Sequence, residues 1–187
     1  KVLELEGFRV IGVDDLLPNV ISPAGVLGDV EPDKKARVSI NVARQAAILI
    51  GTEDRGQGAI AFQGKVLSVE DENGTDAMIR HLPSLRNTKK GGVLVKVSKP
   101  GQEMRVDLPT IGVSTIENAA KAGLEGVAVQ AGKALIVDMN AVVTSANEHG
   151  LFVVGVEVDD PLIYIIAGEA SGDLLGARVM ARLKEKN

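Results

Sequence analysis

The sequence predicts an α/β fold, a mixed sheet with helices, followed by one strand–turn–helix unit of a truncated doubly wound domain. Segments with apolar residues three and four positions apart, typical of amphipathic helices, alternate with short aliphatic runs, typical of strands. The chain has 187 residues, of which 45% are apolar and 25% are charged. It is therefore long and apolar enough to bury a sizeable core.

The sequence of the first third of the chain predicts two helices, a strand and a hairpin. A helix at the start leads to a strand at Phe8–Val13. Apolar residues at helical spacing over Asp33–Ile50 predict an amphipathic helix that ends at Gly51. Strand-like runs on both sides of Gln63-Gly64 then predict a β-hairpin.

The middle of the chain predicts a short helix, a strand and a loop. The Thr75 hydroxyl is expected to cap a helix over Asp76–Leu82, which Pro83 ends or bends. Gly91–Val97 is typical of a strand, and the polar stretch Ser98–Pro109 is typical of an irregular loop. This loop is the segment in which we first look for function.

The next helix has matching start and stop signals. Ser114 and Glu117, three residues apart, form a capping-box pattern, and the helix that it opens stops at Gly123. Two strands are then expected, at Gly126–Gln130 and Ala134–Val137.

The last third predicts a helix, a strand and a domain boundary. Asp138 is expected to cap a helix that runs to His149, and a strand follows at Leu151–Val156. We place a boundary at the acidic linker Glu157–Pro161, which separates a domain at 1–158 from the strand–turn–helix unit at 162–187. Because that unit cannot bury both of its faces alone, we expect it to open a further doubly wound domain.

Composition excludes several classes of function. The absence of cysteine excludes a disulfide scaffold, a cysteine-based metal site and a thiol nucleophile. A net charge of −4 and only four aromatic residues argue against nucleic acid as a partner. No apolar run approaches the ~18 residues that span a bilayer. Lacking an initiator Met, the chain is expected to be part of a longer polypeptide.

A concentration of basic residues opposes this negative net charge. It has two readings: a solvated surface, as most charge runs are, or a clamp for a phosphate or diphosphate. The stretch holds seven basic residues and one acid, Glu103; the basic residues are Arg80, Arg86, Lys89, Lys90, Lys96, Lys99 and Arg105.

Acidic residues flank the basic stretch, with Glu70 and Asp76 on one side and Asp107 on the other. Carboxylates beside a phosphate-binding patch suit Mg²⁺, which prefers one or two carboxylates together with phosphate oxygens. The alternative is that these residues form turns and caps. Arg105 and Asp107 fall on the same side of an extended segment, where they would either face a site or form an ion pair worth ~0 to 1 kcal/mol if exposed.

Four of these stretches together resemble a known family; they are Gly56–Ala59, Gly74–Arg80, Lys99–Gly112 and Gly150–Val156. The similarity is to the LpxI-type UDP-2,3-diacylglucosamine pyrophosphatases of lipid A biosynthesis, and it covers about residues 1–158. The Lys99–Gly112 stretch, which includes Arg-Val-Asp-Leu-Pro-Thr-Ile-Gly, is long enough to be specific.

The resemblance implies a Mg²⁺-dependent hydrolase that splits UDP-2,3-diacylglucosamine into UMP and 2,3-diacylglucosamine 1-phosphate, known as lipid X. Enzymes of this family have two domains, with the ligand held between them. The chain resembles the C-terminal one, which implies an N-terminal domain of the same enzyme as its partner. It also implies a cytoplasmic protein that contacts the inner membrane peripherally.

The resemblance also implies roles for individual residues. The family's strongest catalytic candidate corresponds to Asp107, which would handle metal or water, and Asp76 would be a second metal ligand. The remaining matches would bind substrate; they are Thr75, Asp76, Arg80, Lys99, Gln102, Arg105 and Thr110.

The tail resembles a different family. Residues 163–177 look like the start of lipid A disaccharide synthase, the enzyme that consumes lipid X, although so short a piece would have no transferase activity. A rival function for the whole chain is a non-catalytic module that binds an acyl-sugar phosphate or packs against a partner domain.

Overall fold

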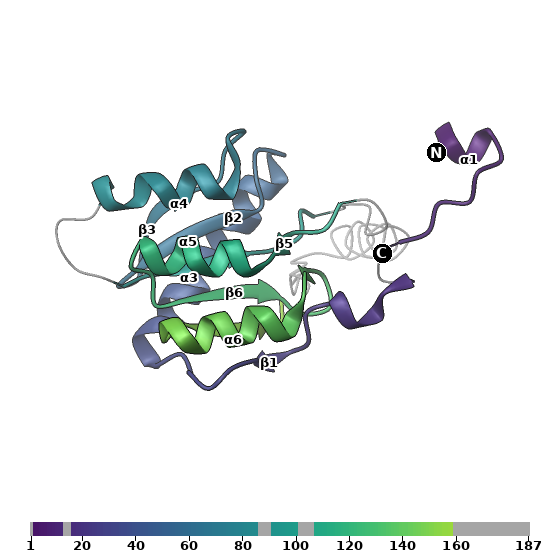
Figure 1. The fold of residues 1–187 in the computed structure, drawn as a ribbon. Helices are drawn as coiled ribbons and strands as arrows, with labels where there is room; N and C mark the ends of the chain where they lie inside the picture. Colours follow the sequence, from purple (N-terminus) through teal and green to yellow (C-terminus); the bar gives the residue numbers. More distant parts are fainter. Residues whose placement is uncertain (1, 13–15, 86–90, 101–106, 159–187) are drawn as a thin grey trace, which may run out of the picture.

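The computed structural model describes residues 2–12, 16–85, 91–100 and 107–158 (Figure 1). The described helices are α1 (Val2–Leu5), η1 (Pro18–Val20), α3 (Lys34–Thr52), α4 (Gly74–Leu85), α5 (Val113–Lys121) and α6 (Met139–His149). The described strands are β1 (Gly25–Val26), β2 (Gly58–Phe62), β3 (Lys65–Val69), β4 (Val93–Lys96), β5 (Thr110–Ile111), β6 (Gly126–Gln130), β7 (Leu135–Ile136) and β8 (Phe152–Val156).

Six of these strands form one mixed sheet, in the order β1-β8-β6-β4-β2-β3. The three central strands, β8, β6 and β4, are parallel, whereas β1 and the β2–β3 hairpin pair antiparallel at the two sides. A separate parallel pair joins β5 to β7. The predicted mixed α/β fold is confirmed.

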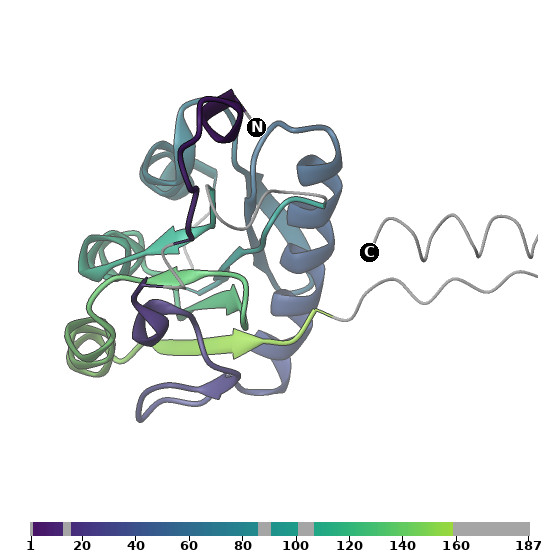
Figure 2. The same ribbon diagram turned by 90° about the vertical axis from the view of Figure 1, so that its right-hand side faces the viewer.

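Helices cover both faces of this sheet, so that the domain has three layers (Figure 2). On one face lies α3, and its small residues Ala36, Ala43 and Ala47 pack on the alternate strand residues Val93 and Val95. The opposite face lies under α4, α5 and α6, with a core of larger aliphatic side chains such as Ile60, Leu94 and Ile116. Each face thus uses every second residue of the strands.

Elements with strong local signals form where the sequence predicts them. Asp33 caps α3, because its Oδ1 accepts a hydrogen bond from the Ala36 amide at 2.7 Å. Asp138 caps α6 in the same way, and Gly150 ends α6 with φ at 66°, a left-handed conformation that favours glycine. The predicted hairpin is present as β2 and β3.

Three local predictions are wrong in detail. The described residues of the expected strand at Phe8–Val13 form no strand, and β1 at Gly25–Val26 was not expected. The helix α4 begins at Gly74 and continues through Pro83, so Thr75 lies inside it rather than capping it. The third wrong prediction concerns the residue that caps α5.

At the start of α5, the capping residue is Gly112 and not Ser114. The backbone N–H of Gly112 donates to the Thr115 hydroxyl at 3.3 Å, and the Thr115 amide donates back to the Gly112 carbonyl at 3.0 Å. A threonine three residues after the cap does here what Glu117 was expected to do. The predicted strand–turn–helix unit at 162–187 lies outside the described residues.

The topology gathers several chain segments at one edge of the sheet. The carboxyl ends of β4, β6 and β8 lie side by side there, since these strands are parallel. Because β2 runs antiparallel to β4 and β3 antiparallel to β2, the start of β2 and the end of β3 reach the same edge. Crevices outside the carboxyl ends of parallel strands are where ligands bind in open α/β sheets.

Candidate functional site

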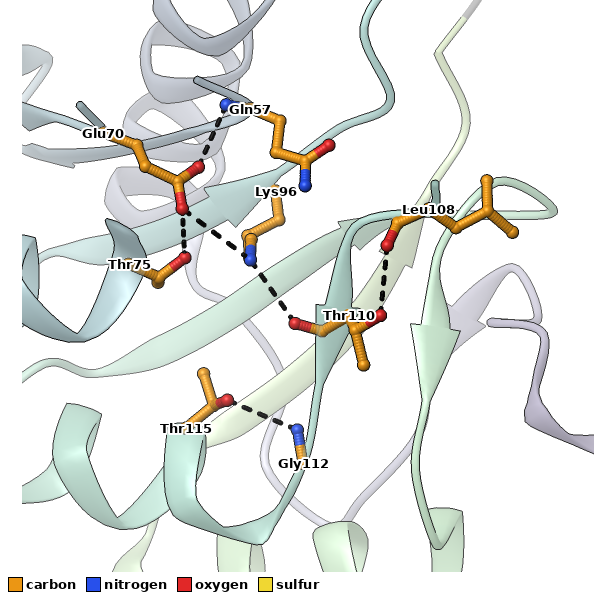
Figure 3. A network of polar contacts seen from close by, with 8 residues as sticks. All are labelled: Gln57, Glu70, Thr75, Lys96, Leu108, Thr110, Gly112 and Thr115. Carbon is orange, nitrogen blue, oxygen red and sulfur yellow. Dashed lines mark hydrogen bonds and ion pairs between the residues drawn. The ribbon is translucent and has the colours of Figure 1, made fainter. Parts of the chain in front are cut away.

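A buried ion pair lies at this edge of the sheet. Lys96, the last residue of β4, and Glu70, the residue after β3, have side chains that are 8% and 9% exposed. The Lys96 ammonium lies 4.0 Å from Glu70 Oε1 (Figure 3). Buried charges are expensive unless they are paired and hydrogen-bonded, so the remaining contacts of both groups matter.

The Glu70 carboxylate accepts hydrogen bonds from two further segments. The Thr75 hydroxyl, in the first turn of α4, donates to Oε1, and the Gln57 backbone N–H donates to Oε2 at 2.9 Å. The carboxylate also lies against Gly58, where an added Cβ would come within 3.1 Å of Oε2. The absence of a side chain at Gly58 thus lets the carboxylate lie close to the backbone without having to shift.

Lys96 connects the ion pair to β5. Its ammonium donates to the Thr110 carbonyl at 3.4 Å, and the Thr110 hydroxyl donates to the Leu108 carbonyl at 3.0 Å. Figure 3 shows both contacts. The backbone that follows Asp107 is thereby tied to the end of β4.

The electrostatics place three carboxylates around Lys96. Burial lowers the pKa of Lys96, and the negative charges of Glu70, Asp76 and Asp107 each oppose that change. Asp76 and Asp107, which are 31 positions apart in the chain, thus lie within electrostatic reach of one buried ammonium.

Asp76 and Arg80 share a face of α4, because they are four residues apart in one helix. Both residues are exposed. The Asp76 Oδ1 accepts a hydrogen bond from the Asn118 side chain of α5 at 3.2 Å. Asp76 lies in the first turn of the helix, whereas Arg80 lies one turn further from the edge of the sheet.

The segment that follows β4 is held by β6. Gln130, the last residue of β6, is 5% exposed, and its Oε1 accepts from both the amide and the hydroxyl of Ser98, at 2.9 and 2.8 Å. These two hydrogen bonds fix the backbone next to Lys99. The side chain of Lys99 in turn forms an ion pair with Asp54 at 2.7 Å.

This second ion pair differs from the first in exposure. The Asp54 side chain is 86% exposed, and its hydrogen bond with Lys99 lowers the pKa of Asp54 and raises that of Lys99. Lys99 therefore remains protonated well above neutral pH. A hollow of about 620 Å³, lined by Gln57, Glu70 and Lys99 among others, lies beside this pair.

The structure brings most of the predicted site residues to one edge of the sheet. Thr75, Asp76, Lys99, Asp107 and Thr110 all lie there. Thr75 is engaged with Glu70, and Thr110 contacts Lys96 through its carbonyl. Arg80 lies further along α4, and the predicted substrate contacts Gln102 and Arg105 fall outside the described residues.

Sequence reasoning missed four residues that organise this edge. Glu70 and Lys96 were noticed only as charges that flank or belong to the basic stretch, and Gln57 and Gln130 received no role. The sequence does offer one signal for Gln57, which is the glycine on each side of it. These glycines mark a close approach of the backbone, since an added Cβ at Gly56 would come within 2.7 Å of the Glu70 carbonyl oxygen. Nothing local marks Gln130.

The carboxylates fit a magnesium ion only with help from a phosphate. Within the described residues no three histidine or carboxylate side chains are grouped closely enough to hold a metal by themselves. Asp76 and Asp107 are both exposed near the edge of the sheet. Two such carboxylates with phosphate oxygens are the ligand set that Mg²⁺ ordinarily takes in phosphate chemistry.

Comparison with known proteins identifies the family of this fold. The family model described as the LpxI C-terminal domain matches residues 23–154. The chain belongs to the LpxI C-terminal domain family. The match includes α3, the whole six-stranded sheet except the last two residues of β8, and the edge that carries Glu70, Lys96 and Asp107.

A curated member of the LpxI family gives a more specific likeness. The chain is 46% identical over 160 residues to a protein of Caulobacter vibrioides named UDP-2,3-diacylglucosamine pyrophosphatase LpxI. The match covers 82% of this chain and 57% of the relative. The chain thus spans a little over half the length of that relative. None of the helices within the described residues is long and apolar enough to cross a membrane.

Proposed function

We propose that this chain is the C-terminal part of a Mg²⁺-dependent hydrolase that acts on UDP-2,3-diacylglucosamine. The products would be UMP and 2,3-diacylglucosamine 1-phosphate. The membership of the LpxI C-terminal domain family and the name of the Caulobacter relative support this proposal.

One observation carries the proposal further. Carboxylates suited to a metal, Asp76 and Asp107, lie at the same edge of the sheet as the Lys99 ammonium, a predicted phosphate contact. A diphosphate carries negative charge that needs both kinds of partner. The rival reading, a module that binds without hydrolysis, requires the cations but gives no reason for aspartates beside them.

The roles of the residues follow from their exposure. The exposed carboxylates Asp76 and Asp107 would hold the ion, which when bound neutralises diphosphate charge and lowers the pKa of a coordinated water. Lys99 would leave the exposed Asp54 and contact a phosphate oxygen. Gln102 and Arg105 stay predicted phosphate contacts.

Hydrolysis breaks one P–O bond of the diphosphate and joins the oxygen of water to one phosphorus. The proton that the water loses needs an acceptor within hydrogen-bonding reach. We assign that role to an oxygen of Asp107.

The proposal includes a partner and a location. An N-terminal domain of the same enzyme would close the other side of the ligand. The acyl chains of the substrate would bring the enzyme into peripheral contact with the cytoplasmic face of the inner membrane. The part of the Caulobacter relative that lies outside the 57% match leaves room for such a domain.

The test is a UMP-release assay on the parent polypeptide that includes the N-terminal domain, with UDP-2,3-diacylglucosamine and Mg²⁺. We expect Asp107→Ala to lower kcat by about 100- to 1,000-fold, as loss of one preorganised charge contact does. Glu148→Gln, which removes an exposed carboxylate on α6, is the matched control and should keep parental activity.

Two outcomes would contradict the proposal. Parental kcat in a folded Asp107→Ala variant would remove Asp107 from the reaction. If the parent itself bound substrate without releasing UMP, the non-catalytic module would be the better function. The 187-residue chain assayed alone would show whether it holds the ligand without the N-terminal domain.

A further inference from the structure

The buried pair formed by Lys96 and Glu70 lies beneath the proposed site. We propose that this pair is a positioning device for the reaction, which sets the place of Asp107 relative to the first turn of α4. This inference rests on the proposed function. It adds two residues that are neither exposed candidates nor predicted contacts of the substrate.

The pair contacts three segments besides the two that carry its charges. Through Glu70 it contacts the start of β2 at Gln57 and the first turn of α4 at Thr75. Through Lys96 it contacts β5 at the Thr110 carbonyl. Figure 3 shows these contacts converging on the two charged groups.

Two of the joined segments carry the proposed metal ligands. Asp76 directly follows Thr75 in α4, and Asp107 precedes Thr110 by three residues. Since Thr75 is held by Glu70 and Thr110 by Lys96, the length of the ion pair governs the separation of the two aspartates. The Glu70 side chain is 9% exposed and engaged by the groups around it, so it is poorly placed to bind a ligand.

Stability alone does not account for the pair. Replacing a buried ion pair by neutral groups of similar volume is often neutral or stabilising, whereas removing one partner is strongly destabilising. A fold that needed only stability at this place would be served as well by an apolar pair. A pair whose hydrogen bonds reach both ligand-bearing segments is instead suited to fix a geometry.

The expected consequence is kinetic. A misplacement of reacting groups by about 1 Å can lower a rate by about 100-fold without changing what the site contains. Because Lys96 and Glu70 are buried, substrate affinity should depend on them little. Loss of the pair should therefore lower kcat and leave KM nearly unchanged.

The test uses UMP release by the parent polypeptide joined to its N-terminal domain, with three changes. Glu70→Gln keeps the volume, the acceptor for Gln57 and the charge of Lys96, but it removes the ion pair. The double variant Lys96→Met with Glu70→Gln removes both charges and leaves no uncompensated one. The matched control applies the same substitutions to the exposed pair Lys121 and Glu117 of α5.

We expect the double variant to keep a Tm within a few degrees of the parent, whereas Glu70→Gln, which leaves the buried Lys96 ammonium without its carboxylate, should lower the Tm by more. Both should lose about 10- to 100-fold in kcat with KM changed by less than about 3-fold, and the α5 control should match the parent.

Three results would overturn the inference: parental kcat in the folded double variant, parental kcat in Glu70→Gln, or a loss that appears mainly in KM. If Glu70→Gln does not fold, the double variant still decides. A parent that releases no UMP would instead overturn the proposed function, which is a separate result.

Discussion

The two ends of the central strands differ in the kind of contact that holds them. At the carboxyl ends of β4 and β6, the terminal residues Lys96 and Gln130 are buried polar side chains with polar partners. At the amino end of β6, Gly126 lies against the ring of Phe152, where an added Cβ would come within 2.4 Å of ring atoms. One end is held by directed contacts and the other by close packing.

This difference separates function from stability within a single sheet. Directed contacts specify the positions of groups, whereas tight packing of glycine against an aromatic ring specifies only how close the backbones lie. Changes at the carboxyl ends should therefore affect the reaction, and changes at the amino ends should affect the free energy of unfolding.

Among the changes that compare the two ends of the strands, the largest effect is expected at the carboxyl ends, from Asp76→Asn. The change keeps an acceptor for Asn118 but removes a charge from the proposed metal site, so UMP release by the parent polypeptide should fall about 100-fold. The Tm should not change. Glu72→Gln, an exposed carboxylate in the loop before α4, is the control and should leave UMP release near the parental value. If UMP release fell equally in both variants, the cause would be the change in net charge and not the loss of Asp76 from the site.

A packing change at the amino ends should give the next largest effect. Gly126→Ala places a methyl group against the Phe152 ring and should lower the free energy of unfolding by about 2 to 3 kcal/mol. Denaturant titration of the parent polypeptide with and without this change measures the difference in the free energy of unfolding. If the ring is the cause, Gly126→Ala combined with Phe152→Leu should cost less than the sum of the single changes. Activity per folded molecule should be unchanged, and a large fall in kcat would break the comparison of the two ends.

A smaller effect on both properties is expected from Gln130→Leu. It removes the acceptor for the amide and hydroxyl of Ser98, which should cost about 1 kcal/mol in the free energy of unfolding. Because Lys99 is the next residue, its position should loosen and KM should rise a few-fold. Unchanged KM in the folded variant would show that the Ser98 contact does not position Lys99.

The smallest effect is expected from Asp54→Asn, since the Asp54 side chain is 86% exposed. Lys99 lowers the pKa of Asp54, so the stabilisation from ionised Asp54 is present above its ordinary value of 3.8 and is lost as the pH falls through the lowered pKa. The raised pKa of Lys99 means that its share is present below 10.5 and is lost at more alkaline pH. The Tm curves of parent and variant should differ slightly near neutral pH and converge at both extremes. A difference in Tm between parent and variant that increases at acid pH would contradict the ion pair of Asp54 with Lys99 as its cause.

Elements governed by neighbouring residues were predictable. Asp33 and Asp138 each cap a helix by bonding an amide three residues ahead, and such contacts are encoded within one turn. The two capping errors arose where another nearby group takes the hydrogen bond that the sequence pattern assigns to the expected cap. Thr75 was expected to cap a helix, but its hydroxyl donates to Glu70, and α4 starts at Gly74.

The candidate site was predictable as a set of residue types and not as a geometry. The stretches Gly74–Arg80 and Lys99–Gly112 marked the segments that hold the candidate ligands Asp76 and Asp107. The contacts that organise them join residues far apart, such as Asn118 with Asp76 at a separation of 42 positions and Ser98 with Gln130 at 32. No periodicity or spacing connects such residues.

The sequence by itself determined the mixed α/β class, the helix ends marked by Asp33, Asp138 and Gly150, and the segments that carry the candidate chemistry. Those properties depend on side-chain periodicity, short-range hydrogen bonds and residue type. Only the tertiary structure decided that Lys96 and Glu70 are buried together between α4 and β5. Burial and pairing of charges depend on which strands become neighbours, and strand order is set by the packing of the whole sheet.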